Sequence, residues 1–250
     1  MSIYESWLVK QPIAHRGLFD EKHPENSLAA FKNAVKNKIP IELHVSFLTD
    51  GTPVVFHDER LARMTGRDGF ISNCTYKDIE KLTLLGTKEK IPTLAEALNV
   101  IDGKVPVLIA IKNYGKIGAF EKATWKVLQT YSGEYAIESF NPYTLEWFKQ
   151  NAPKVKRGQI SCFFKDKEIT GIKKFALKRM LLNKKISEPN FIVYCAEDMP
   201  NKYVKKYYGE LPILVYTIKN AEDEAAIRDY CDNIIFDSYL PEAAEDKKTK

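Results

Sequence analysis

Two short motifs of the chain, His15-Arg16-Gly17 and His57-Asp58, join histidines to charged residues, and each follows a run of β-type residues. Between these motifs, Glu42 and His44 stand two residues apart on a third such run, so they share one face of a strand. Imidazole exchanges a proton near neutral pH, and a Glu-x-His pair offers two ligand atoms to a cation. The pattern indicates acid/base chemistry beside a cation.

The elements that must position these residues alternate between strand-like and helix-like runs. Strands are expected at Pro12–His15, Pro40–Phe47, Val105–Lys112, Tyr135–Phe140, Gly158–Cys162, Phe191–Cys195, Pro212–Ile218 and Asn233–Asp237. Helices are expected at Ser27–Lys36, Thr75–Leu82, Thr93–Ile101, Ala119–Tyr131, Pro142–Gln150, Thr170–Asn183, Lys202–Tyr208 and Ala221–Cys231. Eight strands, each but the last followed by helix, favour an α/β fold of the TIM (β/α)8 barrel type over an open doubly wound sheet.

A small hairpin is predicted after the second strand. The Asp50-Gly51 turn connects that strand to Val54–His57, which we interpret as a return arm and not as a barrel strand.

In such barrels, catalytic groups lie at the carboxyl ends of strands. His15 ends the first strand, and Lys112 ends the third, where Ala110 and Lys112 share a face. A lone strand histidine is often structural, and His57-Asp58 could simply close the hairpin. Several polar groups converging on strand ends nevertheless favour a site, because burying polar groups without partners is costly.

Composition limits the remaining functions. The 250 residues suit one domain, 1–250, with a polar tail at 243–250. The net charge of +5 is spread along the chain, which argues against nucleic-acid binding and suits an anionic small substrate. The longest apolar run, Val105–Ile111, is too short to cross a membrane, and no segment near the start resembles a signal peptide, so a cytoplasmic protein is expected. The sequence leaves the oligomeric state open.

The motifs and their order resemble those of the glycerophosphodiester phosphodiesterases. The matching segments are Ile13–Gly17, Pro24–Ser27, Ile41–Val45, Val54–Asp58, Ile91–Leu94, Ile111–Lys112, Ser139–Phe140 and Ile234–Asp237. The resemblance covers nearly the whole chain and is dense as far as Lys112. It implies a TIM barrel and a hydrolase of lipid metabolism that cleaves glycerophosphodiesters to glycerol phosphate and an alcohol.

The resemblance also implies roles for individual residues. His15 and His57 would be the general acid/base pair, and Arg16 and Lys112 would neutralise the phosphate of a small-molecule phosphodiester. Glu42 would bind a divalent cation, calcium or magnesium. The substrate pocket would include Glu25, Phe140 and Tyr216, although Glu25 could instead belong to a helix start and Tyr216 could be a core aromatic.

Two departures from the family pattern concern the metal. In the family pattern the second strand usually reads Glu-x-Asp, and this chain has His44 at the Asp position. The third strand usually reads Glu-Ile-Lys, and this chain has Ala110 at the Glu position. Calcium and magnesium prefer hard oxygen ligands, so we expect their binding to be weakened or lost. Glu42 with His44 would suit zinc or manganese better, and Glu138 or Glu197 could add an oxygen.

Three interpretations follow. The favoured one is a hydrolase with an altered or impaired metal site. The main alternative is a catalytically inactive pseudoenzyme that binds a phosphorylated or polyol ligand, with Lys112 pairing with Glu42 in place of the cation. A barrel that binds no ligand is the third.

Overall fold

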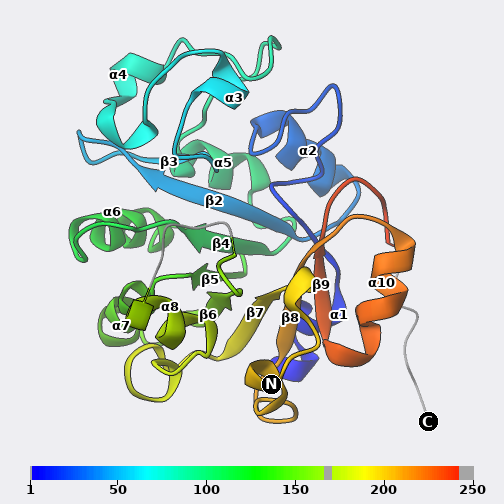
Figure 1. Cartoon of the computed structure of the whole chain (residues 1–250). Helices are drawn as coiled ribbons and strands as arrows, with labels where there is room; N and C mark the ends of the chain where they lie inside the picture. Colours follow the sequence, from blue (N-terminus) through cyan, green and yellow to red (C-terminus); the bar gives the residue numbers. More distant parts are fainter. Residues whose placement is uncertain (1, 166–170, 242–250) are drawn as a thin grey trace.

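The computed structural model describes residues 2–165 and 171–241 and shows a closed parallel barrel (Figure 1). Its eight parallel strands are β1 (Ile13–Ala14), β2 (Ile41–Phe47), β4 (Val107–Ile111), β5 (Tyr135–Ser139), β6 (Lys156–Ser161), β7 (Phe191–Cys195), β8 (Ile213–Ile218) and β9 (Asn233–Phe236). They are ordered β1-β9-β8-β7-β6-β5-β4-β2, and pairing of β1 with β2 closes the ring. The predicted (β/α)8 barrel is confirmed.

Helices cover the outside of the barrel (Figure 1). They are α2 (Leu28–Lys36), α5 (Leu94–Ile101), α6 (Ala119–Leu128), α7 (Pro142–Asn151), α8 (Gly171–Lys178), α9 (Lys202–Lys205) and α10 (Ala221–Ile227), with α1 (Trp7–Lys10) preceding β1. No described helix is long and apolar enough to cross a membrane.

Several helices are shorter than predicted. The helix expected at Ala221–Cys231 ends at Ile227 and continues as a 3₁₀ turn, Arg228–Tyr230. The helix expected at Thr170–Asn183 corresponds to α8, which ends at Lys178. The chain then turns and forms a π-helical turn at Asn183–Ser187. Thr170 itself lies outside the described residues, as does the proposed polar tail at 243–250.

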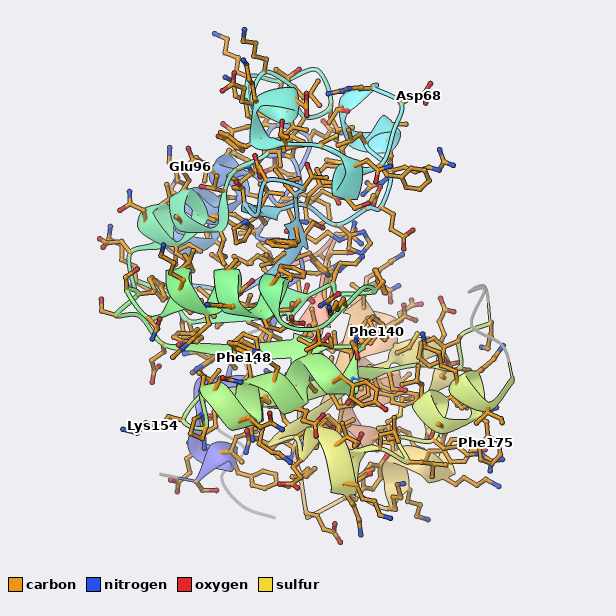
Figure 2. The ribbon with its side chains drawn as sticks, turned by 90° about the vertical axis from the view of Figure 1, so that its left-hand side faces the viewer. Asp68, Glu96, Phe140, Phe148, Lys154 and Phe175 are labelled. Carbon is orange, nitrogen blue, oxygen red and sulfur yellow. The ribbon has the colours of Figure 1, made fainter. Side chains whose placement is uncertain are left out.

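Strand β3 (Pro53–Val55) runs antiparallel to β2, which confirms the predicted hairpin. Beyond it the chain forms a small insertion that contains α3 (Ala62–Thr65), a 3₁₀ turn (Ile71–Asn73) and α4 (Tyr76–Ile79), the only α-helix within the expected Thr75–Leu82. The insertion has its own apolar cluster, which includes Leu61, Met64 and Ile71. Figure 2 shows the insertion, labelled at Asp68, at one end of the molecule, away from α7 (Phe148) and α8 (Phe175).

The interior of the barrel is layered. Leu108 on β4, Ala136 on β5 and Leu214 on β8 belong to one buried apolar cluster, which Leu8 of α1 joins. Side chains alternate along a strand, so Ala110 and Glu138 occupy the next inward positions of β4 and β5. The apolar layer therefore supports a polar layer nearer the carboxyl ends of the strands.

Candidate active site

The polar residues singled out in the sequence converge at the carboxyl end of the barrel. His15 follows β1, and Lys112 follows β4. Glu42 and His44 point from β2, and His44 lies opposite Ala110 in the β2–β4 register. These residues come from neighbouring strands because β1, β2 and β4 are adjacent in the barrel.

His15 is held by a carboxylate from the last strand. Its Nδ1 lies 3.0 Å from Asp237 Oδ2, and a carboxylate can only accept, so Nδ1 carries the proton. The other nitrogen, Nε2, accepts from Arg16 Nε at 3.2 Å and lies 3.7 Å from Glu42 Oε2. Nε2 of His15 therefore faces the site as a lone pair.

His57 is held in the same way by its neighbour. Its Nδ1 lies 2.7 Å from Asp58 Oδ1, and Lys112 Nζ donates to the His57 carbonyl oxygen at 2.7 Å. Burial lowers the pKa of His57 to about 4, with the charges of Lys112 and Arg16 adding to the effect and Asp58 opposing it. His57 is therefore neutral at physiological pH, with Nε2 able to accept a proton.

A chain of ion pairs connects the two histidine motifs. Arg16 donates to Glu25 at 2.7 Å. Arg63, on α3, donates to Glu25 at 2.7 and 2.9 Å and to Asp58 at 2.5 and 2.9 Å. Although burial opposes it, these partners hold the pKa of both Glu25 and Asp58 below the usual values. Glu25 therefore lies between the two histidine motifs and positions Arg16.

Local backbone geometry explains the roles of Arg16, Gly17 and Asn26 in the segments Ile13–Gly17 and Pro24–Ser27. Gly17 has φ +82°, and a Cβ there would lie 2.9 Å from Phe31 Cδ1, so glycine is required. Arg16 has φ +60°, and its carbonyl accepts from the Asn26 backbone N–H at 2.8 Å. The Asn26 side chain in turn accepts from the backbone N–H of His44 at 3.2 Å. The motifs thus fix Arg16 and His44 relative to each other.

The centre of the site is a buried group of two imidazoles and a carboxylate. One ligand atom from each of His15, Glu42 and His44 lies within 4.8 Å of the other two, and His44 Nε2 is 3.6 Å from Glu42 Oε1. The ring of His44 is 4.6 Å from that of His57 and 5.5 Å from that of His15, centroid to centroid. Burial, followed by the charges of the neighbouring residues, holds the pKa of His44 well below its usual value, so it is neutral.

Glu138 adds a second carboxyl group to the interior. It lies opposite Ala110 in the β4–β5 register, so His44, Ala110 and Glu138 form one row across three strands. Burial and the adjacent Glu42 raise the pKa of Glu138 well above its usual value. Among the described residues, the hydrogen-bond partner of Glu138 is the Glu42 carboxylate, to which Glu138 donates when it is protonated. No described residue bonds His44 Nδ1.

Three of the cavities adjoin the site. One of about 550 Å³ is lined by His57 and Lys112 together with residues of the insertion, such as Phe70. A second, of about 480 Å³, is lined by Phe140 and shares residues 113–115 with the first. A third, of about 950 Å³, is lined by Glu25 and Asp237. Tyr216 packs edge-on against Phe140 with centroids 6.3 Å apart, and its hydroxyl donates to the Ser161 carbonyl at 3.3 Å.

Sequence reasoning missed part of this arrangement. Asp237 was noted only as part of a matching segment, although it ends a strand as His15 does. Arg63 carried no signal, because its partners are set by the fold of the insertion. Glu138 is one of the two residues expected to add an oxygen ligand. An acidic residue inside an apolar strand is the sequence signal that identifies it. Glu197, suggested with it, is exposed on the 3₁₀ turn Ala196–Asp198.

Comparison with known proteins agrees with this geometry. Among curated proteins, a glycerophosphodiester phosphodiesterase of Caldanaerobacter subterraneus is 39% identical over an alignment 159 residues long that covers 58% of this chain and 64% of that protein. A putative glycerophosphodiester phosphodiesterase of Bacillus subtilis is 32% identical over 60% of this chain and 65% of its own length. The matches thus span just under two thirds of these relatives.

Solved structures share the fold at low identity. A phosphodiesterase of Oleispira antarctica, in complex with the product sn-glycerol-3-phosphate, has a TM-score of 0.78 at 24% identity over 92% of this chain and 94% of its own. A glycerophosphodiester phosphodiesterase of Thermotoga maritima has a TM-score of 0.70 at 23% identity over 91% and 95%. The sequence model of the glycerophosphoryl diester phosphodiesterase family matches residues 15–239. The chain therefore belongs to the glycerophosphoryl diester phosphodiesterase family.

Proposed function

We propose that the protein hydrolyses glycerophosphodiesters to glycerol phosphate and an alcohol, with His15 and His57 as the acid/base pair. The observation that carries this proposal is that both rings bind a carboxylate through Nδ1, Asp237 in one case and Asp58 in the other. Each ring therefore turns Nε2 away from its carboxylate, and on His15 this nitrogen accepts from Arg16, a residue proposed to bind the phosphate. The ring centroids are 6.5 Å apart, so a phosphate group can be contacted from both sides.

The state of His57 suits it to act as the base. Because its pKa is about 4, it is unprotonated at neutral pH, and its Nε2 can take a proton from the water that attacks the phosphorus. The imidazolium that forms is stabilised by Asp58, while Arg63 keeps that carboxylate in position. His15 is assigned the complementary step: its Nε2 takes up a proton from solvent and delivers it to the leaving alcohol, while His57 returns to solvent the proton that it accepted.

Arg16 and Lys112 are proposed to bind the phosphate. Arg16 Nε donates to His15 Nε2 at 3.2 Å and Lys112 Nζ donates to the His57 carbonyl oxygen at 2.7 Å, so each charge lies against one of the two proposed catalytic residues. A phosphodiester anion there would neutralise them and make protonation of His57 easier, which couples substrate binding to proton transfer. Phe140 and Tyr216 are proposed to border the alcohol or glycerol side of the substrate.

The donor set does not fit the calcium or magnesium expected from the family. These ions take six or more oxygen ligands or a near-ideal octahedron of oxygens. The central group offers the carboxylate of Glu42, while His44 is an imidazole and Ala110 has no ligand atom. We propose that affinity for both ions is lower by roughly 10²–10⁴ than with three carboxylates. Calorimetry that gave a micromolar constant for either ion would contradict this.

The second candidate is an inactive protein that binds a phosphorylated or polyol ligand. The loss of acidic ligands at positions 44 and 110 favours it, since the phosphate-facing charges of Arg16 and Lys112 remain. Both candidates predict ligand binding, so only turnover separates them.

The deciding experiment measures glycerol phosphate release from a set of glycerophosphodiesters, with magnesium, calcium, manganese, zinc or chelator. Variants His15→Ala and His57→Ala test the pair, and His23→Ala is the matched control because His23 is a half-exposed histidine paired with Asp20 outside the site. Hydrolysis lost in the first two variants and kept in the third supports the enzyme. Turnover that appears only after His44→Asp with Ala110→Glu supports the inactive protein instead.

A further inference from the structure

We infer that the surface formed by α8 and the turns that follow it, residues 171–187, binds the surface of an anionic lipid membrane. The residues proposed above for acid/base catalysis and phosphate binding lie outside this segment. Membrane binding can therefore be measured without turnover, and the inference does not depend on the proposed hydrolysis.

The segment carries an unbalanced positive charge. Residues 171–187 contain no acidic residue and six basic residues, which are Lys173, Lys174, Lys178, Arg179, Lys184 and Lys185. When residues 166–170, which lie outside the described residues, are included, the stretch has seven basic and two acidic residues. The difference equals the net charge of +5 of the whole chain. The basic excess, expected from the sequence to be spread along the chain, is therefore concentrated in this stretch.

The same segment exposes apolar side chains among its basic residues. Ile172 is 87% exposed, Phe175 47% and Leu181 49%, and α8 contains no buried residue. Figure 2 shows α8, labelled at Phe175, at the outer edge of the molecule. Apolar side chains grouped with basic ones on an exposed helix are typical of segments that lie in the interface of a membrane.

The positive charges of the segment are not neutralised by acidic neighbours. Among the described residues, no ion pair involves a basic residue of 171–187, and Glu188, the next acidic residue along the chain, pairs with Lys149. The guanidinium carbon of Arg179 instead lies 3.7 Å from the centroid of the Phe175 ring. A charged head above an apolar side chain is the arrangement that basic residues adopt at a membrane surface.

Helix α9 extends this basic surface. Lys206 Nζ, just beyond α9, donates to the carbonyl oxygen of Arg179 at 3.2 Å, and burial, followed by the charge of Lys184, lowers the pKa of Lys206. Arg179 and Lys202 also lie over the Tyr203 ring, at 5.4 and 5.7 Å from its centroid. Two basic segments that are separate in the sequence thus lie side by side, which favours an extended anionic surface over a single small anion.

The second cavity, of about 480 Å³, lies between this surface and the candidate site. Ile172 and Leu177 of α8 line it together with Phe140, and it shares residues 113–115 with the cavity lined by His57 and Lys112. A membrane bound at α8 would therefore lie beside the cavities that adjoin the site.

Two other occupants fit this surface less well. A second copy of the chain docked through the same surface would bring like charges together. A nucleic acid would contact the basic side chains through its phosphates, but such contacts leave the exposed Ile172 and Leu181 without a role. An anionic membrane uses both the charges and the apolar side chains.

The test measures sedimentation of the full chain with vesicles of phosphatidylglycerol mixed with phosphatidylcholine and with vesicles of phosphatidylcholine alone. We expect binding to the anionic vesicles only, and weaker binding as the salt concentration rises. A basic residue near an anionic surface contributes about fivefold in affinity, so Lys184→Gln with Lys185→Gln should weaken binding roughly 25-fold. Phe175→Ser should weaken it about tenfold because an inserted aromatic side chain is lost.

Matched controls exist elsewhere on the chain. Lys122 and Lys126 are exposed on α6, so Lys122→Gln with Lys126→Gln removes the same charge from another face. Phe70 is 38% exposed and Arg60 lies 4.4 Å from its ring centroid, so Phe70→Ser is the control for Phe175→Ser. Both controls should leave vesicle binding unchanged, and circular dichroism checks that each variant is folded.

Equal binding to the two kinds of vesicle, or equal weakening in the test and control variants, would overturn the inference. So would displacement of the vesicles by a short DNA duplex that binds more tightly, or self-association without vesicles that Lys184→Gln with Lys185→Gln abolishes. A chain that binds anionic vesicles but never releases glycerol phosphate contradicts the proposed hydrolase alone. Hydrolysis of dissolved glycerophosphodiesters without vesicle binding contradicts this inference alone.

Discussion

Replacing Glu138 by Gln should stabilise the protein at neutral pH but not in acid. Its carboxyl group is 1% exposed and lies beside the Glu42 carboxylate, to which it donates a hydrogen bond when protonated. Burial and the like charge raise its pKa well above the ordinary 4.5. The folded protein therefore keeps this proton over a pH range in which the unfolded chain has released it.

The sign and size of the effect follow from linkage. A raised pKa contributes stability that is fully present below pH 4.5 and is lost as the pH rises toward the folded value. In that window, the unfolding free energy of the natural chain loses about 1.4 kcal/mol per pH unit because of this group. Glutamine is close in shape to a protonated glutamate and does not ionise. The unfolding free energy of Glu138→Gln should therefore rise relative to that of the natural chain by the same amount per pH unit.

The assay is urea unfolding of both chains in chelator, followed by circular dichroism across pH 4–9. Glu121→Gln is the matched control, because Glu121 is equally buried but accepts from Asn113, Thr144 and the Gly118 backbone N–H, each at 2.7 Å. In Glu121→Gln the amide NH₂ group would be a donor placed against these donors. We therefore expect the unfolding free energy to fall by about 1–3 kcal/mol. If the difference between Glu138→Gln and the natural chain does not vary with pH, the reasoning about the Glu42–Glu138 pair is wrong.

Three further predictions concern the frame of the site. The kcat/KM profile for hydrolysis should have an acid limb near pH 4 from His57, and Asp58→Asn should move that limb lower, because Asp58 raises this pKa. Gly17→Ala should cost about 2–5 kcal/mol in urea unfolding from backbone strain plus overpacking, whereas Gly51→Ala, at φ +86° with no atom within 4 Å, should cost only about 1–2 kcal/mol. Arg63→Ala should reduce kcat while changing the unfolding free energy by under about 1 kcal/mol, since Arg63 is half exposed.

The barrel could be predicted from sequence because its strands are buried on both faces and read as separate apolar runs. Val107–Ile111 and Phe191–Cys195 illustrate this, with nearly every residue buried. The hairpin followed from the Asp50-Gly51 turn, and β3 pairs with β2 as that turn requires. Helix lengths were harder, because the ends of α8 and α10 depend on turns whose local signals are weak.

The residues of the candidate site that lie at strand ends could be predicted from the sequence. The contacts that these residues make could not. His15, Glu42 and Lys112 stand where strand periodicity places them. The ion pairs of Arg63 could not be foreseen, because they depend on how a short helix of the insertion packs against the barrel. The proximity of Glu138 to Glu42 depends on the register of three strands, which a single sequence does not specify.

The carboxylates of the site divide into two sets with different consequences. Asp237 is bonded to His15, and Asp58 to His57 and Arg63. Glu25 is bonded to Arg16 and Arg63, so these three carboxylates orient the groups proposed to act on the phosphate. Glu42 and Glu138 have no arginine or lysine among their ion pairs in the described chain, and His44 is neutral beside them. The carboxylates that hold the proposed acid/base pair are therefore all bonded to basic groups, whereas the two at the cation position expected from the family are not. Replacing Asp58 or Asp237 therefore tests proton transfer, and replacing Glu42 or Glu138 tests ion binding.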